Sequence, residues 1–395
     1  MAVSKKTMFS LRVSFFTLSI IYSVYAPRIP ELKDRLHVSV PTLGVIFMIT
    51  GLAGALTSKL VARIITWLTS RRSILFAIPV AFLGSLIVGN TFRVPFFIAG
   101  LIMMSFSGFL INTAINTQSN NLRATTGDNQ LNNLSAISNL GALFAMVLGS
   151  IFLKVFTTTQ YIVGLEIIAC AIYLLTYHNL IPTDVIGGKG EKAKSKFPWF
   201  KRDRDIIQFW IIVVALFAST TAEFSVSDWG AILSRDSYAV KAPLYLIPFI
   251  VFQSGVVLSR FLTTKLSEKY GEVAYVRYSA IAASIIWGSS IQILAHTKHT
   301  HQVLTIIILI VGFFAAGCGV GPVWPTMLTS AAKSHYPTPA VYARLFAAVS
   351  LAFVFGPGII GYVSKVTSLS NSLMIPVVAL FIVGIFARKS LEHQA

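Results

Sequence analysis

Long apolar runs alternate with short polar stretches along almost the whole chain. Each run is long enough for an α-helix to cross a hydrocarbon layer, which takes about 20 residues. We count twelve of them, at residues 9–27, 40–62, 73–90, 95–117, 132–155, 158–180, 206–227, 242–264, 273–294, 302–327, 339–362 and 369–387. The runs do not alternate between apolar and polar residues as the strands of a membrane barrel would. Because a lipid-exposed backbone must satisfy its own hydrogen bonds, the pattern predicts an all-α polytopic membrane protein with twelve transmembrane helices.

One polar stretch interrupts this pattern after the sixth run. It reads IPTDVIGGKGEKAKSKFPWFKRDRD and is the longest polar segment of the chain. Six spans, a polar linker and six further spans form the layout of transporters that are built from two repeated halves. We therefore expect two six-helix pseudo-repeats: an N-terminal bundle over residues 1–181, a cytoplasmic linker over 182–205 and a C-terminal bundle over 206–395.

Two short echoes within the sequence favour a duplication. GALTSKLVARI, from Gly54, and GVVLSRFLTTKL, from Gly255, belong to the second and eighth runs, and each has serine and a basic residue four and five places after the glycine. GFLINTAIN, from Gly108, and GCGVGPVWP, from Gly317, lie in the fourth and tenth runs. Short matches in apolar sequence also arise by chance, so the echoes support a repeat without establishing it.

The charges fit a membrane protein better than a nucleic-acid binder. Only 12% of the 395 residues are charged, and the net charge is +18, whereas a typical soluble domain is about 25% charged. Basic residues gather in the linker and at one set of run ends, with Lys5, Lys6, Arg63, Arg71, Arg72, Arg123, Lys265, Lys269, Lys333, Arg388 and Lys389. The opposite ends carry fewer, namely Arg28, Lys33, Arg35, Arg93, Lys154, Arg235, Lys241, Lys298 and Lys365. This bias predicts cytoplasmic N- and C-termini, with the linker facing anionic lipid headgroups rather than nucleic acid.

Several classes of protein lack support in the sequence. The first apolar run is too long for a cleavable signal peptide and is expected to be the first span. Cys170 and Cys318 lie inside runs without the spacing of a disulfide framework or a zinc site. No GxxxxGK[ST] stretch is present to bind a nucleotide. We expect no enzyme, no cofactor and no metal site.

Several motifs in chain order resemble one family of transporters. They are SVYAPRIPELKDRLHVSVPTLG (Ser23–Gly44), GFLINTAINTQS, LSAISNLGALFAMVLG (Leu134–Gly149), EFSVSDWGAIL (Glu223–Leu233), GCGVGPVWPTMLTSAA and FVFGPGIIGYV. These motifs resemble fucose-permease-like members of the major facilitator superfamily. The resemblance implies the major facilitator fold, a twelve-helix rocker with a central cavity, which is often a proton-coupled importer of sugars or related solutes.

The chain departs from that resemblance in its N-terminal half. Where such relatives carry an acidic residue it has Asn112, and where they carry a histidine it has Ser135. The loop after the second span, RIITWLTSRR, lacks their acidic residue as well. The resemblance therefore does not carry proton coupling over to the N-terminal half.

Carboxyl groups inside apolar runs are costly and normally face a cavity or a partner. Glu166 is the only acidic residue of its run, and Glu223 lies near the outer end of the seventh run, followed by Asp228 at the expected membrane edge. A carboxyl group partly removed from water is suited to proton exchange, so Glu223 is our first candidate for proton coupling, with Asp228 and Glu166 after it. The alternative for Glu223 is hydrogen bonding to a neighbouring helix for packing alone.

The fourth run ends in the polar stretch NTAINTQSNN. On a helix, Asn112 and Asn116 share one face, since residues four apart lie above one another. Amides offer donors and acceptors without charge, which suits a polyhydroxylated neutral solute. We expect Asn112 and Asn116 to line a cavity, although amides also bond across packed helices. For Asn120 and Asn121 we expect an ordinary polar loop.

Other polar and aromatic residues extend this candidate site. Sugar rings pack on aromatic faces while their hydroxyl groups bind amides, so the cavity candidates also include Tyr22, Tyr25, Asn139, Gln253 and Trp324. Basic residues within or at the ends of runs are candidates for gates or loops, namely Lys59, Arg63, Arg71, Arg72, Arg260 and Arg344. The glycines at 317–321 have the look of a nucleotide loop, but inside a span they indicate close helix approach or a gating bend.

Taken together, these features predict a monomeric secondary active transporter of a bacterial inner membrane. A small polar solute, a sugar or related metabolite, is expected to bind midway between two halves that rock to expose it to either side. Its partners would be the solute, protons and the lipid bilayer. Two alternatives stay open: efflux of a drug or metabolite by proton antiport, and a membrane sensor that keeps the fold without transporting.

Overall fold

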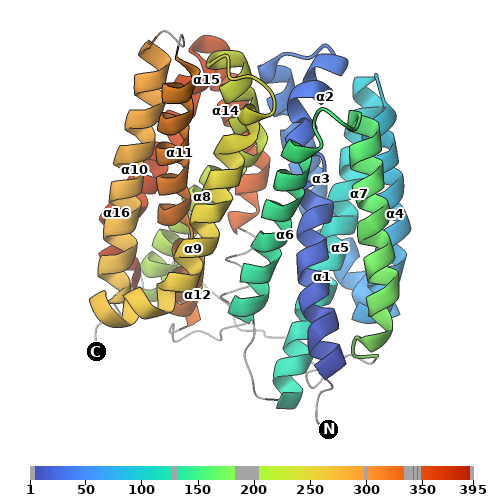
Figure 1. Ribbon diagram of the computed structural model, residues 1–395. Helices are drawn as coiled ribbons and strands as arrows, with labels where there is room; N and C mark the ends of the chain where they lie inside the picture. The colour runs from blue at the N-terminus through green and yellow to red at the C-terminus, as the bar shows by residue number, and fades with distance from the viewer. Residues whose placement is uncertain are drawn as a thin grey trace. The chain divides into compact units, whose positions relative to one another are not determined.

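The structure is a computed structural model that describes residues 5–126, 131–182, 204–297, 301–332, 341, 345 and 348–391. Every regular element in these residues is helical (Figure 1). Eleven helical segments are long and apolar enough to cross a membrane, and Leu351–Val366 is a shorter apolar helix at the place of the remaining span. Large apolar side chains such as Trp67, 82% exposed, cover the outside of the helices, as expected for a surface that faces lipid. The predicted all-α polytopic fold is confirmed.

The chain forms two compact units. Unit 1 comprises residues 1–39 and 49–187, and unit 2 comprises residues 40–48 and 188–395. The first part of α3 therefore groups with unit 2, although the helix continues into unit 1. The exact division at 182–205 that the sequence predicts stays a prediction.

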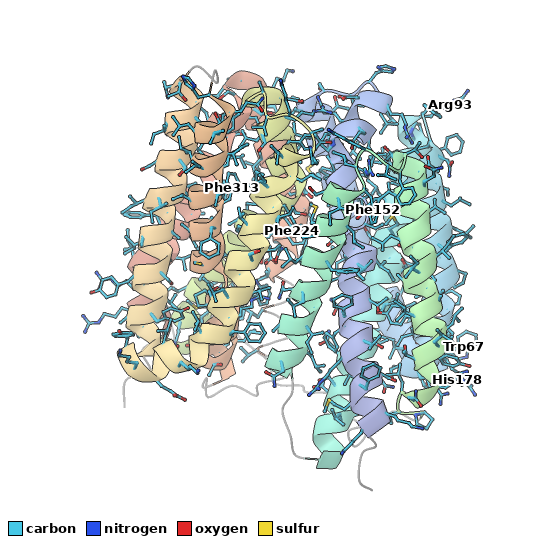
Figure 2. All side chains as sticks on the ribbon, in the orientation of Figure 1. Trp67, Arg93, Phe152, His178, Phe224 and Phe313 are labelled. Atoms are coloured by element: carbon cyan, nitrogen blue, oxygen red, sulfur yellow. The ribbon has the colours of Figure 1, made fainter. Side chains whose placement is uncertain are left out.

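Unit 1 is built around its first helix. Its elements are α1 (Lys5–Ser23), a 3₁₀ turn (Ala26–Arg28), α2 (Ile29–Arg35), the later part of α3 (Val40–Leu68), α4 (Ser70–Asn90), α5 (Val94–Thr126), α6 (Leu131–Ile151), α7 (Thr158–Thr176) and a second 3₁₀ turn (Tyr177–Asn179). Helix α1 packs against α5, α6 and α7, and α4 packs against α5 and α7. Figure 2 shows Trp67 and His178 at one end of this unit and Arg93 at the other.

Unit 2 repeats this packing order with its own helices. They are α8 (Arg204–Ile232), a π-helical turn (Leu233–Ser237), a 3₁₀ turn (Leu244–Leu246), α9 (Ile247–Tyr270), α10 (Glu272–His296), α11 (Gln302–Val320), α12 (Val323–Ala332), α14 (Leu351–Val366), α15 (Leu369–Ser372) and α16 (Met374–Leu391). Helix α8 packs against α12, α14 and α16, and α10 packs against α11 and α16. These pairs match α1 with α5, α6 and α7, and α4 with α5 and α7. The internal packing therefore supports the duplication that the sequence echoes favour.

One turn recurs at the same place in both units. A single residue, Thr69, joins α3 to α4 with φ 74° and ψ 157°, and a single residue, Gly271, joins α9 to α10 with φ 85° and ψ 145°. Such backbone angles are almost confined to glycine. The two matching turns are structural evidence for the repeat at positions where the sequences differ.

Glycines let α9 and α11 approach one another backbone to backbone. A Cβ atom added at Gly317 would lie 2.0 Å from the carbonyl oxygen of Phe252, and one added at Gly255 would lie 2.5 Å from that of Phe314. At Gly321, where α11 ends, an added Cβ would lie 1.9 Å from the Ser259 hydroxyl oxygen. The predicted close approach of the glycine-rich run is confirmed, and the tenth run is interrupted there into α11 and α12.

Two sequence expectations need correction. Asn120 and Asn121 do not lie in a loop, because α5 continues to Thr126 and the Asn121 side chain is buried at 3% exposure. The first apolar run is not a single α-helix either: α1 ends at Ser23, and a 3₁₀ turn over Ala26–Arg28 follows. Arg344 and residues 183–203 of the linker lie outside the described residues, as does the side chain of Lys59.

Candidate functional site

The amide face of α5 is organised by hydrogen bonds along the helix. The amide nitrogen of Asn116 donates to Asn112 Oδ1 at 2.6 Å and to the Asn112 carbonyl oxygen at 2.8 Å. Both side chains are half-buried. The Asn112 amide nitrogen makes no hydrogen bond to any described residue. The pair is therefore held in place by its acceptor end while a donor stays available for a solute.

The ring of Tyr22, near the end of α1, packs against the same face of α5. It packs over Gly108, where an added Cβ would lie 2.5 Å from Tyr22 Cε1. Gly108, Asn112 and Asn116 are spaced by four residues, so they share one face of the helix. The structure thus brings together, within unit 1, the aromatic ring and the two amides that the sequence singled out. Tyr25 follows α1 and is half-buried.

Helix α6 adds weaker polar groups to unit 1. The amide nitrogen of Asn139 donates to the carbonyl oxygen of Ser135 at 2.8 Å, and Ser138 is hydrogen-bonded to Ser19 on α1 at 2.5 Å. The Asn139 amide oxygen has no partner among the described residues. Asn139 is half-buried, and only its amide nitrogen makes a hydrogen bond to a described residue. Its amide oxygen could therefore accept a hydrogen bond from a solute, just as the Asn112 amide nitrogen could donate one.

Glu166 is enclosed in the interior of unit 1. Its side chain on α7 is 0% exposed, and Oε2 makes no hydrogen bond. Cys170 Sγ lies 4.0 Å from Oε1, and Tyr173 interacts electrostatically with both Glu166 and Tyr22. Tyr173 also donates a hydrogen bond of 2.7 Å to the carbonyl oxygen of Ser14. The buried carboxyl thus lies beside Cys170, and no hydrogen-bonded path through the described residues leads from it to Tyr22.

In unit 2, Glu223 on α8 interacts electrostatically with Arg260 on α9. The two groups are not within ion-pair distance, and Arg260 Nε instead donates to the carbonyl oxygen of Gly321 at 3.3 Å. Both side chains are half-buried. The sequence contained both residues, but their proximity depends on how α8 and α9 are aligned.

The alignment of α8 and α9 also places Gln253. Gly230 faces Pro248, since a Cβ added at Gly230 would lie 3.3 Å from Pro248 Cβ. Counting back along α8 and forward along α9 from this contact puts Gln253 between the levels of Glu223 and Asp228. Gln253 is buried at 3% exposure and its Oε1 makes no hydrogen bond. Asp228 is 6% exposed and has no hydrogen-bond partner among the described residues.

Four further side-chain atoms of α8 are buried and make no hydrogen bond to a described residue. They are Ser219 Oγ, Thr220 Oγ1, Thr221 Oγ1 and Trp229 Nε1. Leaving a buried polar atom without a partner costs about 1–3 kcal/mol. These atoms point to different sides of α8, because successive residues are about 100° apart around a helix, so they do not form a single site.

The remaining predicted residues lie away from these polar groups or at helix ends. Trp324 is half-buried and packs against the apolar core of unit 2. Arg71 lies over the ring of Tyr177, 5.1 Å from its centre, while Arg63 and Arg72 are exposed.

Sequence reasoning missed the role of Arg28, which it placed among the outer charges. Arg28 is 2% exposed, donates to the carbonyl oxygens of Leu153, Phe152 and Phe156 at 3.1–3.2 Å, and lies over the ring of Tyr161. Its charge complements the partial negative charge at the end of α6. A basic residue just after a proline in the turn that ends a span was the only sequence signal.

Comparison with known proteins identifies the family. The sequence profile described as Major Facilitator Superfamily matches residues 11–341. The chain belongs to the major facilitator superfamily. The protein is thus an integral membrane transporter rather than an enzyme, as the sequence predicts; the bacterial inner membrane and the cytoplasmic termini stay predictions.

Individual members of the superfamily are similar at low identity. The uncharacterised transporter y4wD of Sinorhizobium fredii is 22% identical over 385 residues, which cover 94% of this chain and 93% of that protein. An uncharacterised MFS-type transporter of Yersinia pestis is 22% identical over 366 residues, covering 91% and 90%. Among solved structures, the nucleoside transporter NupG matches with a TM-score of 0.72 and 13% identity over 99% of this chain and 100% of that chain. A NupG point mutant gives a TM-score of 0.73 at 13% identity, over 97% and 99%. At these identities the structural matches establish the fold alone.

Proposed function

We propose that the protein is a proton-coupled symporter that imports a small, uncharged, polyhydroxylated solute by alternating access. The solute class is a sugar or a related metabolite, and the fucose-permease-like branch of the superfamily is the proposed placement. The observation that carries this proposal is the face of α5 where the Tyr22 ring and the paired amides of Asn112 and Asn116 lie together.

The chemistry of this face favours a neutral solute. Asn112 and Asn116 offer donors and acceptors without charge, and within the described part of the chain neither is paired with an acid or a base. A tyrosine ring one helical turn away offers an apolar surface for the carbon face of a sugar. A ribose carries the same hydroxyl pattern, and NupG is described as a nucleoside transporter, so nucleosides belong in the same set of test solutes.

Three carboxyl groups are the residues that we propose for coupling, two in unit 2 and one in unit 1. Glu223 near Arg260 is the first candidate to carry the proton, and Asp228 and Glu166 are the others. Symport would let a solute accumulate against its gradient when protons flow inward. Antiport would give the opposite direction of solute movement under the same proton gradient, so the direction of flux separates the two alternatives.

The proposal is tested with purified protein in liposomes. A set of sugars and nucleosides is screened first by thermal shift, because a ligand that binds the folded state raises its melting temperature. The best binder is then supplied as radiolabelled solute with an inward proton gradient. We expect uptake by the wild type and a drop of about tenfold or more in solute affinity in Asn116→Ala, which removes one buried polar contact.

Asn90→Ala is the matched control. The Asn90 amide also donates to a carbonyl four residues earlier, at 2.8 Å, but it is exposed at the end of α4. We expect this variant to bind like the wild type. Equal affinity of both variants and the wild type would contradict the assignment of the α5 face. Solute release under an inward proton gradient would replace symport by antiport, and a bound solute that never crosses the membrane would favour a sensor.

A further inference from the structure

A pocket lies at one end of unit 2, away from the polar groups of α8. Its volume is about 510 Å³, and it is lined by Tyr270, Gly271, Glu272, Val273, Ala274, Arg277, Tyr278 and Arg388. These residues come from the α9–α10 turn, the first turns of α10 and the last turns of α16. A pocket of a few hundred Å³ is large enough for a small headgroup.

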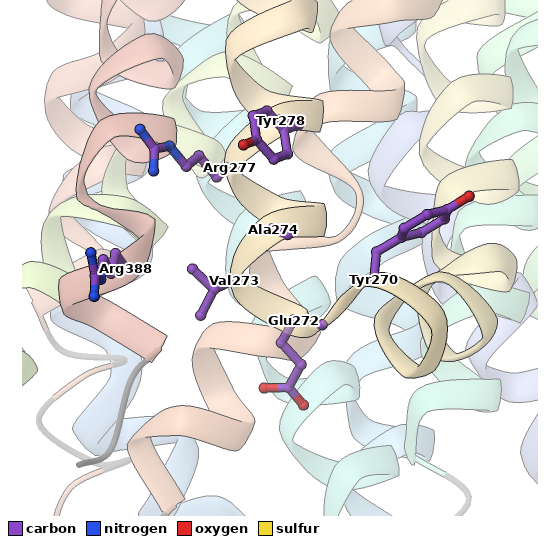
Figure 3. A pocket seen from close by; sticks show the side chains of 8 residues that line it. Tyr270, Glu272, Val273, Ala274, Arg277, Tyr278 and Arg388 are labelled. Atoms are coloured by element: carbon purple, nitrogen blue, oxygen red, sulfur yellow. The ribbon is translucent and has the colours of Figure 1, made fainter.

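Two guanidinium groups dominate the charge of this pocket. Figure 3 shows Arg277 and Arg388 on the same side of α10, with Val273 below Arg277, whereas Glu272 points away from both arginines. Arg277 is exposed, and its recorded contact is with the ring of Tyr278 at 5.9 Å. It has no hydrogen bond or ion pair with any described residue. Arg277 thus presents cationic donors in the fork geometry that matches phosphate oxygens, and Arg388 adds a second positive charge to the pocket.

The pocket continues into a surface suited to acyl chains. Gly384 on α16 touches α10 one turn above Arg388, since an added Cβ would lie 3.0 Å from the Arg277 carbonyl oxygen and 2.6 Å from Ile281 Cγ1. Farther from the end of the unit than the two arginines, α10 exposes Ile285, at 57%, and α16 exposes Ile385, at 51%. At 3.6 residues per turn, Ile285 lies about 80° around α10 from Arg277, and Ile385 about 60° around α16 from Arg388, so each is on a flank of its helix next to the arginine.

We propose that this pocket binds the headgroup of an anionic phospholipid, with the phosphate between Arg277 and Arg388 and the acyl chains along α10 and α16. The excess of basic residues at this end predicts that it faces the cytoplasm, where the leaflet is rich in anionic lipid. Tyr278 is 66% exposed beside the arginines and combines an apolar ring with a polar tip, as residues at the membrane interface do. This site is separate from solute transport.

Native mass spectrometry of the full chain in a non-ionic detergent tests the proposal. The protein is mixed with equal amounts of dioleoyl-phosphatidylglycerol and dioleoyl-phosphatidylcholine, and the lipid that stays bound is measured. We expect the wild type to retain phosphatidylglycerol preferentially. Each arginine near the surface contributes about fivefold in affinity, so Arg277→Gln with Arg388→Gln should remove most of that preference. Restoring the charges as Arg277→Lys with Arg388→Lys should recover part of it.

Lys265→Gln provides the matched control, because Lys265 is an exposed cation on α9 at the same end of unit 2. We expect it to keep the wild-type preference, and melting temperatures without lipid show whether every variant folds. An unchanged preference in the double glutamine variant would overturn the proposal. So would a loss of the same size in Lys265→Gln, which indicates only general attraction. If inorganic phosphate alone displaces the phosphatidylglycerol at millimolar concentration, the pocket binds free anions and the lipid assignment fails.

Discussion

Thr69 occupies a backbone conformation that is unfavourable for a β-branched residue. Its φ of 74° and ψ of 157° fall in a region that glycine adopts easily, and Gly271 fills the matching turn of unit 2. Its hydroxyl oxygen is buried without a hydrogen bond. Strain of this kind costs about 1–3 kcal/mol and persists only where the surrounding structure holds it. In unit 1 the turn is held by hydrogen bonds from Thr69 N to the Ile65 carbonyl and from Ser73 N to the Thr69 carbonyl.

Replacing Thr69 by glycine should therefore stabilise unit 1. Relief of strain outweighs the larger entropy of glycine in the unfolded chain, so we expect Thr69→Gly to raise the free energy of unfolding by about 1 kcal/mol. Thermal unfolding in detergent, followed by tryptophan fluorescence, measures the effect. The same substitution at Thr66, exposed on α3, should lower stability by a few tenths of a kcal/mol, since glycine weakens a helix. A fall in stability for both variants would contradict the strain at Thr69.

Residue patterns predicted the amide face but not this turn. Four-residue spacing fixes which side chains share a helix face, so Asn112 and Asn116 could be paired from the sequence. A one-residue turn leaves no such period, and Thr69 is not a residue that normally marks one. The electrostatic interaction between Glu223 and Arg260 was equally hidden, because it depends on the alignment of two helices rather than on local sequence.

At the scale of elements, the approach of α9 and α11 depends on glycine. The Gly317 backbone lies against the Phe252 carbonyl, where a Cβ would sit at 2.0 Å. Because the backbone of one helix touches the backbone of the other, neither helix can make room without moving as a whole. Gly317→Ala should lower the free energy of unfolding by about 1–3 kcal/mol through overpacking. It should also slow transport if α9 and α11 must keep this spacing. Melting temperature and uptake rate are the measurements.

Gly164→Ala on α7 is the control for the contact between α9 and α11. An added Cβ there meets nothing within 4 Å, so alanine should stabilise the helix by about 0.5–1 kcal/mol through its better propensity. A similar loss in both variants would show that any alanine is harmful in these helices. The glycines at 317–321 predicted a close helix approach or a gating bend, but not which helix would be the partner. The sequence did not predict that α1 breaks after Ser23, since apolarity continues through the break.

At the scale of the whole molecule, the two units share a packing order but differ in where their acidic residues lie. Unit 1 has a fully enclosed carboxyl at Glu166, whereas unit 2 has the half-buried Glu223 near Arg260 and the nearly buried Asp228. Hydropathy predicted the helices, because crossing the lipid requires long apolar runs. The position of the polar linker predicted the two halves. The asymmetry of charge follows from side-chain surroundings, which only tertiary packing determines. It favours unit 2 as the half that couples transport to protons.

Glu223→Gln tests this asymmetry. Glutamine keeps the size and hydrogen bonds of the side chain but cannot carry a proton, so a pH gradient should no longer drive accumulation in liposomes. Exchange of labelled for unlabelled solute needs no net proton movement and should continue at about the wild-type rate, which separates lost coupling from lost folding. Glu268→Gln, an exposed position on α9, should accumulate solute normally. Asp228→Asn and Glu166→Gln are measured alongside, and uphill uptake that survives in Glu223→Gln but fails in one of them would transfer the coupling role to that carboxyl.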